Sequence, residues 1–412
     1  MRRVVITGMG VISPVGNDIA SFWDSLTAGR HGIRPIDRFD AAESDVKLAG
    51  QVRNFDPVAL GVLEKKELRR TDRYCQYALA AAKQALEDCG SDLKDLDPYR
   101  VGVIVGSGIG GMETFEEECR KFDAKGAKRV SVFFIPMMIS NMASGNISIS
   151  TGFKGVNFAP VTACATSSHA IGEAFHNIKN GYLDACVAGG AEGALTPLAV
   201  AGFNNMGALS RSEDPDRASI PFDKERNGFV MGEGAGILIL EELEHAKARG
   251  AKVYAEIVGY GATGDAYHIT SPAPNGEAAA KAMQLAYEEA GLTADDIDYV
   301  NAHGTSTPLN EQYETIAIKL ALGEEKAKAT PVSSTKSMTG HMLGAAGAVE
   351  AIATALALRD GIIPPTVGYC VPDELCDLDC VPNAARKAEL HAALSNSLGF
   401  GGHNAALCLK RF

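Results

Sequence analysis

The 412-residue sequence contains no uninterrupted apolar run of the roughly 20 residues that a membrane-spanning helix needs. It is also short of positive charge, since 39 Lys and Arg stand against 51 Asp and Glu, for a formal net charge of −12. A general nucleic-acid binder needs a basic surface to contact phosphates, so we exclude that class. An anionic partner must therefore bind at a local basic patch.

The nine cysteines follow no regular spacing, which favours reduced thiols in a cytoplasmic protein. Cys370, Cys376 and Cys380 lie close together in sequence but lack a fourth ligand at zinc-type spacing, so we predict no metal there. The first residues, "MRRVVITGMGVISPVG", are basic and then apolar, as in a signal peptide. Glycines and a proline interrupt the apolar run early, and the segment indicates a strand and a turn instead.

Short apolar runs alternate with segments of helical period, which predicts an α/β architecture. The expected strands are 101–108, 184–192, 236–242, 297–304 and 405–412, and the clearest helices are 76–90, 278–292 and 348–361. A strand ending in Gly-x-Gly opens the chain as "VVITGMG" and recurs in "AEIVGYGATGD" at 255–265. We therefore expect two related halves, residues 1–254 and 255–412. The polar segment 211–228 is expected to be a surface loop on the first half.

Cys164 stands out among the cysteines because "VTACATSS" passes directly into a helical pattern. Ile171, Ala174, Phe175 and Ile178 form one apolar helix face, and Gly181 offers a stop. A cysteine at a helix N-terminus lies beside unpaired N–H groups, which predicts a lowered thiol pKa and donors for an oxyanion. The alternative for Cys164 is a small buried apolar side chain, as for most free cysteines.

Three further loops carry chemistry-bearing residues. His303 lies in "NAHGTSTP", His341 in "STKSMTGHMLGAAG" with Lys336 five residues before it, and "SNSLGFGGHNA" (395–405) is rich in glycine. Glu350 falls in the helix after His341, where it can pair with Lys336. Either histidine alone is more often structural, but loops at one sheet edge of an α/β fold converge on one site.

These four segments, together with "PFDKERNGFVMGEGAG" (221–236), resemble the signature segments of the β-ketoacyl-[acyl-carrier-protein] synthases, most closely the synthase II type of bacterial type II fatty acid synthesis. The resemblance runs along the whole chain. It implies a thiolase-like fold of two related halves in α-β-α-β-α layers, a homodimer, and no cofactor or metal. It also implies a decarboxylative Claisen condensation, in which Cys164 takes an acyl chain from acyl carrier protein and malonyl-carrier protein then extends it.

The resemblance also implies roles for individual residues. His303 and His341 would donate hydrogen bonds to the enolate oxygen, and the N–H groups of Cys164 and Phe400 would form an oxyanion hole. Lys336, paired with Glu350, would orient His341. Phe400 would act as a gate with Gly401 and Gly402, and Ile109 would line the acyl pocket.

Two basic clusters are candidates for docking the acidic carrier protein, although charge runs are more often simply solvated. The family resemblance favours docking, and the first cluster matches family docking positions. The clusters are Lys65, Lys66, Arg69 and Arg70, and then Lys125, Lys128 and Arg129.

The chain departs from the family pattern at three places. Glu311 stands where the family usually has Asp, Gly207 stands where a basic residue is common, and "CATSSHA" is unusual directly after the nucleophile. The departure at Glu311 puts local loop contacts in doubt. The departure at Gly207 puts a contact to the carrier protein in doubt.

Four other functions compete with this interpretation. "GSGIGG" (106–111) fits a dinucleotide fingerprint, but "EECRKFDAKGAKR" follows where a helix and an acid-ended strand are needed. A non-catalytic ketosynthase homologue would lack the nucleophile. A thiolase would need a second cysteine where His403 stands. A ketosynthase of a type II polyketide or aryl-polyene pathway stays open, although a stand-alone chain favours fatty acid synthesis.

Overall fold

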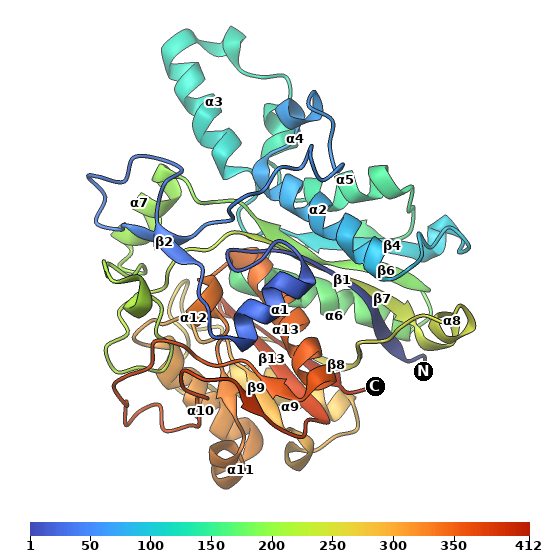
Figure 1. Ribbon diagram of the computed structural model, residues 1–412, viewed down its shortest axis with the longest axis vertical. Coiled ribbons are helices and arrows are strands. Elements are labelled where there is room, and N and C mark those ends of the chain that lie inside the picture. Colours follow the sequence, from blue (N-terminus) through green and yellow to red (C-terminus); the bar gives the residue numbers. More distant parts are fainter.

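The computed structural model describes all residues, 1–412. A ten-stranded sheet runs through it in the order β10-β9-β13-β14-β8-β1-β7-β6-β4-β5 (Figure 1). Its first five strands in sequence are β1 (Val4–Ile12), β4 (Val101–Gly106), β5 (Asn157–Phe158), β6 (Ala185–Glu192) and β7 (Gly234–Glu242). The other five are β8 (Ala255–Gly264), β9 (Tyr299–Asn301), β10 (Val332–Ser333), β13 (Ala392–Gly399) and β14 (His403–Lys410).

The two sets of strands have the same topology. In the first, β4 is parallel to β5 and β6, whereas β7 is antiparallel to β6 and β1. In the second, β9 is parallel to β10 and β13, whereas β14 is antiparallel to β13 and β8. The sets join where β1 pairs antiparallel with β8, with Val4 opposite Ile257. The sheet is therefore built from one five-stranded pattern used twice.

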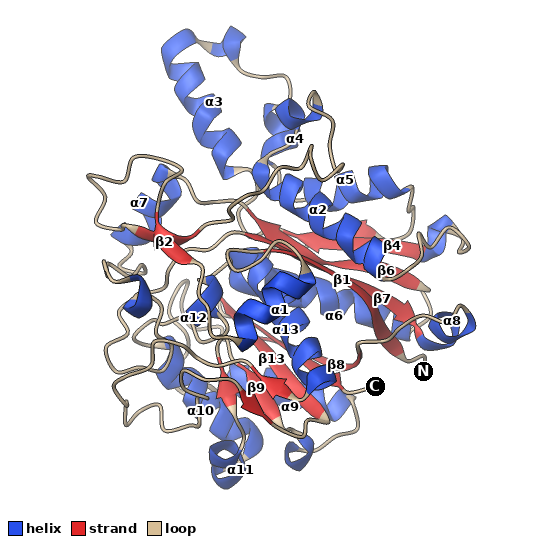
Figure 2. Ribbon diagram, in the orientation of Figure 1, coloured by secondary structure: helices blue, strands red, loops and turns tan.

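The helices complete five layers (Figure 2). Between the two sets of strands lie α6 (Thr166–Lys179) and α13 (Ala346–Asp360), which contact strands of both. The outer faces carry α2 (Arg73–Asp88) and α5 (Met142–Thr151) on one side and α9 (Glu277–Glu289) and α10 (Asn310–Leu322) on the other. Every residue of α13 from 346 to 358 is buried, as a helix apolar on all sides requires. This is the expected thiolase-like layering.

The Gly-x-Gly repeat allows a helix to approach the sheet closely in each half. A side-chain carbon on Gly8 or Gly10 would lie 2.2 or 2.0 Å from a carbonyl oxygen of α2. The same atom on Gly259 or Gly261 would lie 1.9 Å from a carbonyl oxygen of α9. Any residue larger than glycine would therefore push α2 off β1 or α9 off β8.

The remaining elements are short or peripheral. The strands are β2 (Ile33–Pro35), β3 (Leu48–Gly50), β11 (Ile362–Ile363) and β12 (Arg386–Lys387). The helices are α1 (Ile19–Thr27), α3 (Met112–Lys125), α4 (Phe134–Met138), α7 (Pro197–Asn205), α8 (Leu243–Ala248), α11 (Glu324–Ala329) and α12 (Lys336–Thr339). Among these helices, none combines the length and apolar character needed to cross a bilayer.

Three sequence predictions need correction. The predicted loop 395–405 is mostly the β13–β14 hairpin, with only a tight turn at 400–402. Segment 211–228 is not a simple surface loop, because residues 218–223 are buried and Ser219 donates a hydrogen bond to the carbonyl of Lys336 at 2.8 Å. A helix, α3, does follow "GSGIGG", but it projects from the molecule with α4 instead of packing on the sheet as a dinucleotide-binding crossover would (Figure 1).

Candidate active site

Cys164 lies in a single 3₁₀ turn, Ala163–Ala165, that leads directly into α6. Ala163 adopts a left-handed conformation with φ of +50°, which is uncommon for a residue with a side chain. The β13–β14 hairpin presses against this turn, because a side-chain carbon on Gly399 would lie 2.7 Å from the carbonyl of Thr162 and 3.3 Å from the nitrogen of Cys164. The thiol is thus held in a packed, strained turn and is only 8% exposed.

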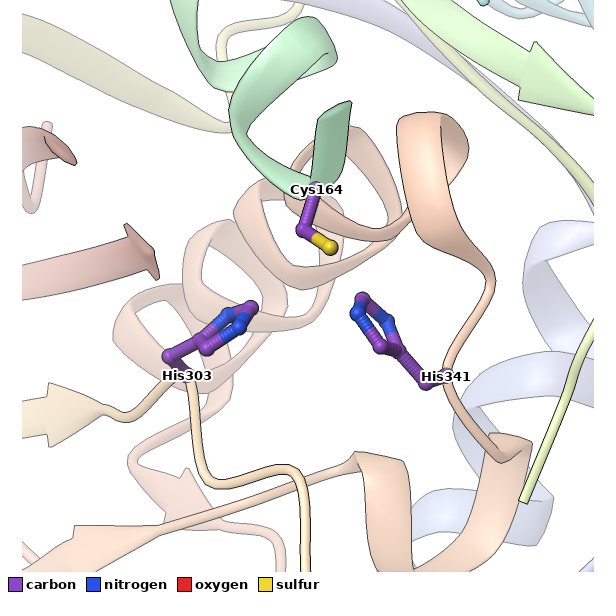
Figure 3. Close-up of side chains that lie close together, drawn as sticks. All are labelled: Cys164, His303 and His341. Carbon is purple, nitrogen blue, oxygen red and sulfur yellow. The ribbon is translucent and has the colours of Figure 1, made fainter. Parts of the chain in front are cut away.

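His303 and His341 face Cys164 from the other half of the chain (Figure 3). His303 follows β9 and His341 follows α12, and both are buried. Their ring centroids are 5.3 Å apart with an interplanar angle of 87°. The sulfur and one nitrogen of each ring lie within 4.8 Å of one another. The structure therefore brings the three residues expected to react into one cluster.

His341 has a defined proton position. The backbone N–H of Leu343 donates to Nδ1 at 3.3 Å, so this nitrogen is the acceptor and the proton resides on Nε2. Nε2 is buried and has no partner. The ring is further held edge-on by Phe229, 5.2 Å between centroids. His341 thus offers a free N–H donor to a ligand.

Lys336 contacts His303 and not His341, the histidine beside which the sequence-based expectation placed it. Its ammonium donates to the carbonyl of His303 at 2.7 Å and lies 3.4 Å from Nδ1 of that ring. It also pairs with Glu350, and both side chains are almost fully buried. An ammonium can only donate, so Nδ1 of His303 accepts and its proton also resides on Nε2. Both rings therefore carry their proton on the nitrogen away from the protein contact.

Burial keeps both imidazoles neutral. It holds the pKa of His303 and that of His341 well below the usual 6.5, and the charge of Lys336 acts in the same direction. Burial also raises the pKa of Cys164 to about 11, although Lys336 and the N–H of Phe400 oppose this rise. The predicted lowering of the Cys164 pKa is therefore wrong, because the closed site outweighs the helix N-terminus. The resting group is a thiol.

The same three side chains are a possible zinc donor set, since thiolate and imidazole are its common ligands. The buried ammonium of Lys336 beside His303 opposes a second cation, so we predict that no metal is held here. Cys376 and Cys380 are buried while Cys370 is exposed, and these three form no comparable cluster.

Residues 1–246 match the family described as "Beta-ketoacyl synthase, N-terminal domain", and residues 254–370 match its C-terminal domain. The chain belongs to the β-ketoacyl synthase family. It is 53% identical over 411 residues to the 3-oxoacyl-[acyl-carrier-protein] synthase 2 of Staphylococcus aureus strain N315, covering 100% of this chain and 99% of that protein.

Two solved structures of synthases are similar over the full length. A β-ketoacyl synthase from Burkholderia phymatum STM815 shares 38% identity at a TM-score of 0.92, with 100% of both chains covered. AntDE:AntF, a type II polyketide carrier protein in complex with its ketosynthase, shares 34% identity at a TM-score of 0.91, covering 100% of this chain and 99% of that one. The 53% identity to the Staphylococcus aureus synthase is higher than the 34% identity to this polyketide ketosynthase.

The turn expected to act as a gate joins β13 and β14. Phe400 is half-buried there, and its backbone N–H acts to lower the pKa of the Cys164 thiol. Gly401 and Gly402 follow with φ of +86° and +73°, a left-handed pair that side chains disfavour. The structure therefore places Phe400 next to the nucleophile, on a turn that only glycines accommodate easily.

Ile109 lines an apolar cavity of about 370 Å³ next to the loop after β4. Its other lining residues are Gly111, Met112, Phe115, Met138, Ile139 and Ser140. Five of the seven lining residues are hydrophobic, so the cavity is apolar.

The candidate docking residues are all exposed, in the turns Glu67–Arg70 and Ala127–Arg129 and their flanks. Lys66 is paired with Glu64 at 2.7 Å, whereas Lys65 and Arg69 have no carboxylate partner. The guanidinium of Arg70 stacks 4.9 Å from the ring of Phe133, four residues after Arg129. The two basic clusters therefore lie near each other, around α3 and α4.

The departures from the family pattern have local explanations. Glu311 is buried, accepts from the N–H of Ser306 at 3.1 Å, and lies 3.3 Å from Arg226. Gly207 ends α7 with φ of +69°, where a basic side chain would be strained. His169 lies in α6 and hydrogen-bonds through Nδ1 to the hydroxyl of Tyr260 at 2.5 Å.

Two buried carboxylates in the site were missed by sequence analysis. Glu192, at the end of β6, accepts from Ser107 at 2.9 Å and from the N–H groups of Gly108 at 2.9 Å and Gly344 at 3.1 Å. It thereby ties the loop of Ile109 to the turn that follows His341. Glu314 accepts from the N–H of His303 at 2.7 Å. An acidic residue ending an apolar strand, as in "VAGGAE", was the available signal for Glu192.

Proposed function

We propose that this protein elongates fatty acids by condensing malonyl-carrier protein with an acyl chain held on Cys164, giving 3-oxoacyl-carrier protein and CO₂. The observation that carries the proposal is one nucleophilic sulfur facing two neutral imidazoles whose Nε2 protons are free for a ligand. Neutral N–H donors suit an enolate oxygen, whose negative charge develops only in the reaction.

In the first step, the sulfur of Cys164 attacks the thioester carbonyl of acyl-carrier protein. The carbonyl oxygen becomes negative and is stabilised by the N–H groups of Cys164 and Phe400. The carrier thiol leaves with the proton that Cys164 gives up. Because the resting group is a thiol, this proton must move during the step, and Lys336 lowers the cost of the transient thiolate through its charge.

In the second step, the carboxylate of malonyl-carrier protein leaves as CO₂, and the electrons of the broken C–C bond form a thioester enolate. Nε2 of His303 and Nε2 of His341 donate to the enolate oxygen. The enolate carbon attacks the acyl thioester on Cys164, whose sulfur leaves and takes up one proton. The balance is one acyl group transferred, one CO₂ released and one proton consumed.

In this proposal, several residues assist without reacting. Lys336 and Glu350 hold His303, and Phe400 moves aside to admit malonate once Cys164 is acylated. Ile109 lines the acyl chain's cavity. Lys65, Lys66, Arg69, Arg70, Lys128 and Arg129 bind the acidic carrier protein.

We also propose that the protein is cytoplasmic and that two copies of the chain form a homodimer. Each chain consists of two halves, 1–254 and 255–412. Support for the dimer comes from β5, which is the edge strand of the sheet and exposes Phe158 at 38%. Val156 and Val161 beside it are 36% and 54% exposed. An uncovered apolar edge strand is a template for pairing with a second copy.

A condensation assay tests the function. Purified protein is given malonyl-carrier protein and a series of acyl-carrier primers, and products are identified by mass spectrometry. We expect 3-oxoacyl-carrier products two carbons longer than each primer, with Cys164→Ala inactive. Products extended repeatedly without further enzymes would instead assign the chain to a polyketide or aryl-polyene pathway. No product from any primer would contradict both.

A further inference from the structure

A second cavity, of about 450 Å³, lies apart from the active site. Its lining comes from the segment between β1 and α1, from Ser25 of α1, from the segment between α1 and β2, from Arg34 of β2, and from the chain just after β3. The basic lining residues are Arg30, His31, Arg34 and Arg53. None of the lining residues belongs to the proposed catalytic machinery or the docking clusters.

The charge of this cavity is opposite to that of the protein. The lining contains no Asp or Glu, although the chain carries a net charge of −12. Arg30 and Arg34 form no ion pair, and their side-chain bonds are to the hydroxyl of Ser25 at 3.4 Å and the carbonyl of Ile33 at 2.6 Å. Two guanidinium groups are therefore free of any carboxylate in the same hollow.

The other two basic residues already have carboxylate partners. His31 pairs with Asp216 at 2.7 Å, and Arg53 pairs with Asp37. The His31 ring also lies 3.3 Å from the guanidinium of Arg34. Both carboxylates lie outside the lining, so no acidic side chain in the hollow offsets the positive charge of Arg30 and Arg34.

The size and polarity of the cavity restrict what it can hold. Only one of its twelve lining residues is hydrophobic, which disfavours an acyl chain or an aromatic base. A protein helix, about 10 Å wide with its side chains, is too bulky for a hollow of this volume. Guanidinium groups bind phosphate oxygens through paired N–H donors.

We propose that this cavity binds a small phosphate-bearing molecule through Arg30 and Arg34. This binding site is separate from the condensation reaction, and its presence does not depend on the function proposed above. Diphosphate is a suitable probe because it offers several anionic oxygens and fits well within the volume.

Titration calorimetry with inorganic diphosphate at fixed ionic strength tests the proposal. The full-length protein is compared with the double variant Arg30→Ala/Arg34→Ala and with a control, Lys387→Ala/Arg411→Ala, which removes equal charge from exposed positions elsewhere. We expect saturable one-site binding in the wild type and the control, and at least tenfold weaker binding in the arginine variant. Thermal unfolding of each variant verifies that it is folded. The single variants Arg30→Ala and Arg34→Ala should each show part of the loss of diphosphate affinity seen in the double variant.

Three results would overturn the proposal. One is no saturable binding in the wild type, and another is equal affinity in all variants. The third is unchanged diphosphate affinity in the arginine variant with a raised KM for acyl-carrier protein, which would assign these arginines to protein docking.

Discussion

Leu343 donates its backbone N–H to Nδ1 of His341 at 3.3 Å, and it does so from a left-handed conformation with φ of +48°. Leu343 begins a 3₁₀ turn that leads into α13, as Ala163, with φ of +50°, begins the turn that carries Cys164 into α6. The two halves thus use the same strained turn for different purposes. In one half it presents the nucleophile, and in the other it fixes the proton of His341 on Nε2.

From this geometry we expect His303→Ala and His341→Ala to accept an acyl group to some degree but to lose malonyl decarboxylation. Loss of one donor to a developing oxyanion typically lowers the rate by about 10²–10³. Release of CO₂ from labelled malonyl-carrier protein measures the second step, and acylation of Cys164 by mass spectrometry measures the first. Full decarboxylation in either variant would contradict the donor role of that histidine.

Cys164 should be the residue acylated by acyl-carrier protein. Cys119 and Cys370 are the exposed cysteines, and a general alkylating reagent should modify these first. The acyl group should instead appear only on the peptide containing residue 164, because its sulfur alone has oxyanion donors and two histidines beside it. Peptide mapping after both treatments makes the comparison. Acyl groups on an exposed cysteine, with residue 164 unmodified, would reverse the assignment.

Much of this site could be predicted from the sequence, because local pattern determines where Cys164, His303 and His341 stand relative to strands and helices. The Gly-x-Gly repeat likewise predicted two related halves, and the close approach of α2 and α9 explains why Gly8 and Gly259 recur.

What depends on tertiary packing was missed or wrong. The pKa of Cys164 rises because β13, β14 and the opposite half close over it, and no local pattern reports that burial. The contact of Lys336 with His303 instead of His341 depends on how α12 meets the loop after β9. Glu192 was missed because its three donors come from loops 84 and 152 residues away in sequence.

Glu192 should make stability depend on pH. Burial raises its pKa to about 7, from a usual 4.5, so the folded state binds a proton more tightly than the unfolded state. The resulting stabilisation is complete below pH 4.5 and is lost as the pH rises through 7. Glu192→Gln mimics the protonated form and should lack this loss.

We therefore compare the free energy of unfolding of Glu192→Gln with that of the wild type at each pH. The variant's value minus the wild-type value should increase by up to about 3 kcal/mol from pH 5 to pH 8. Denaturant unfolding at the two pH values measures it. Glu117→Gln, at an exposed carboxylate that forms no ion pair, is the control for the substitution itself. An equal difference at both pH values would mean that Glu192 is ionised throughout.

Reversing the charges of Lys65 and Arg69 should weaken carrier-protein docking without touching the chemistry. Both are exposed and free of carboxylate partners, so their positive charge is available to an acidic surface. Such charges act mainly on association, and their effect weakens as salt rises. We expect Lys65→Glu/Arg69→Glu to raise the KM for acyl-carrier protein about tenfold or more at low salt, and less at high salt. Turnover of a small acyl thioester should stay nearly constant.

The control Lys387→Glu/Arg411→Glu shifts the net charge equally and should change the kinetics with neither substrate. If the small thioester also suffered, the change would be acting through the fold, and if neither substrate suffered, this patch would not be the docking surface.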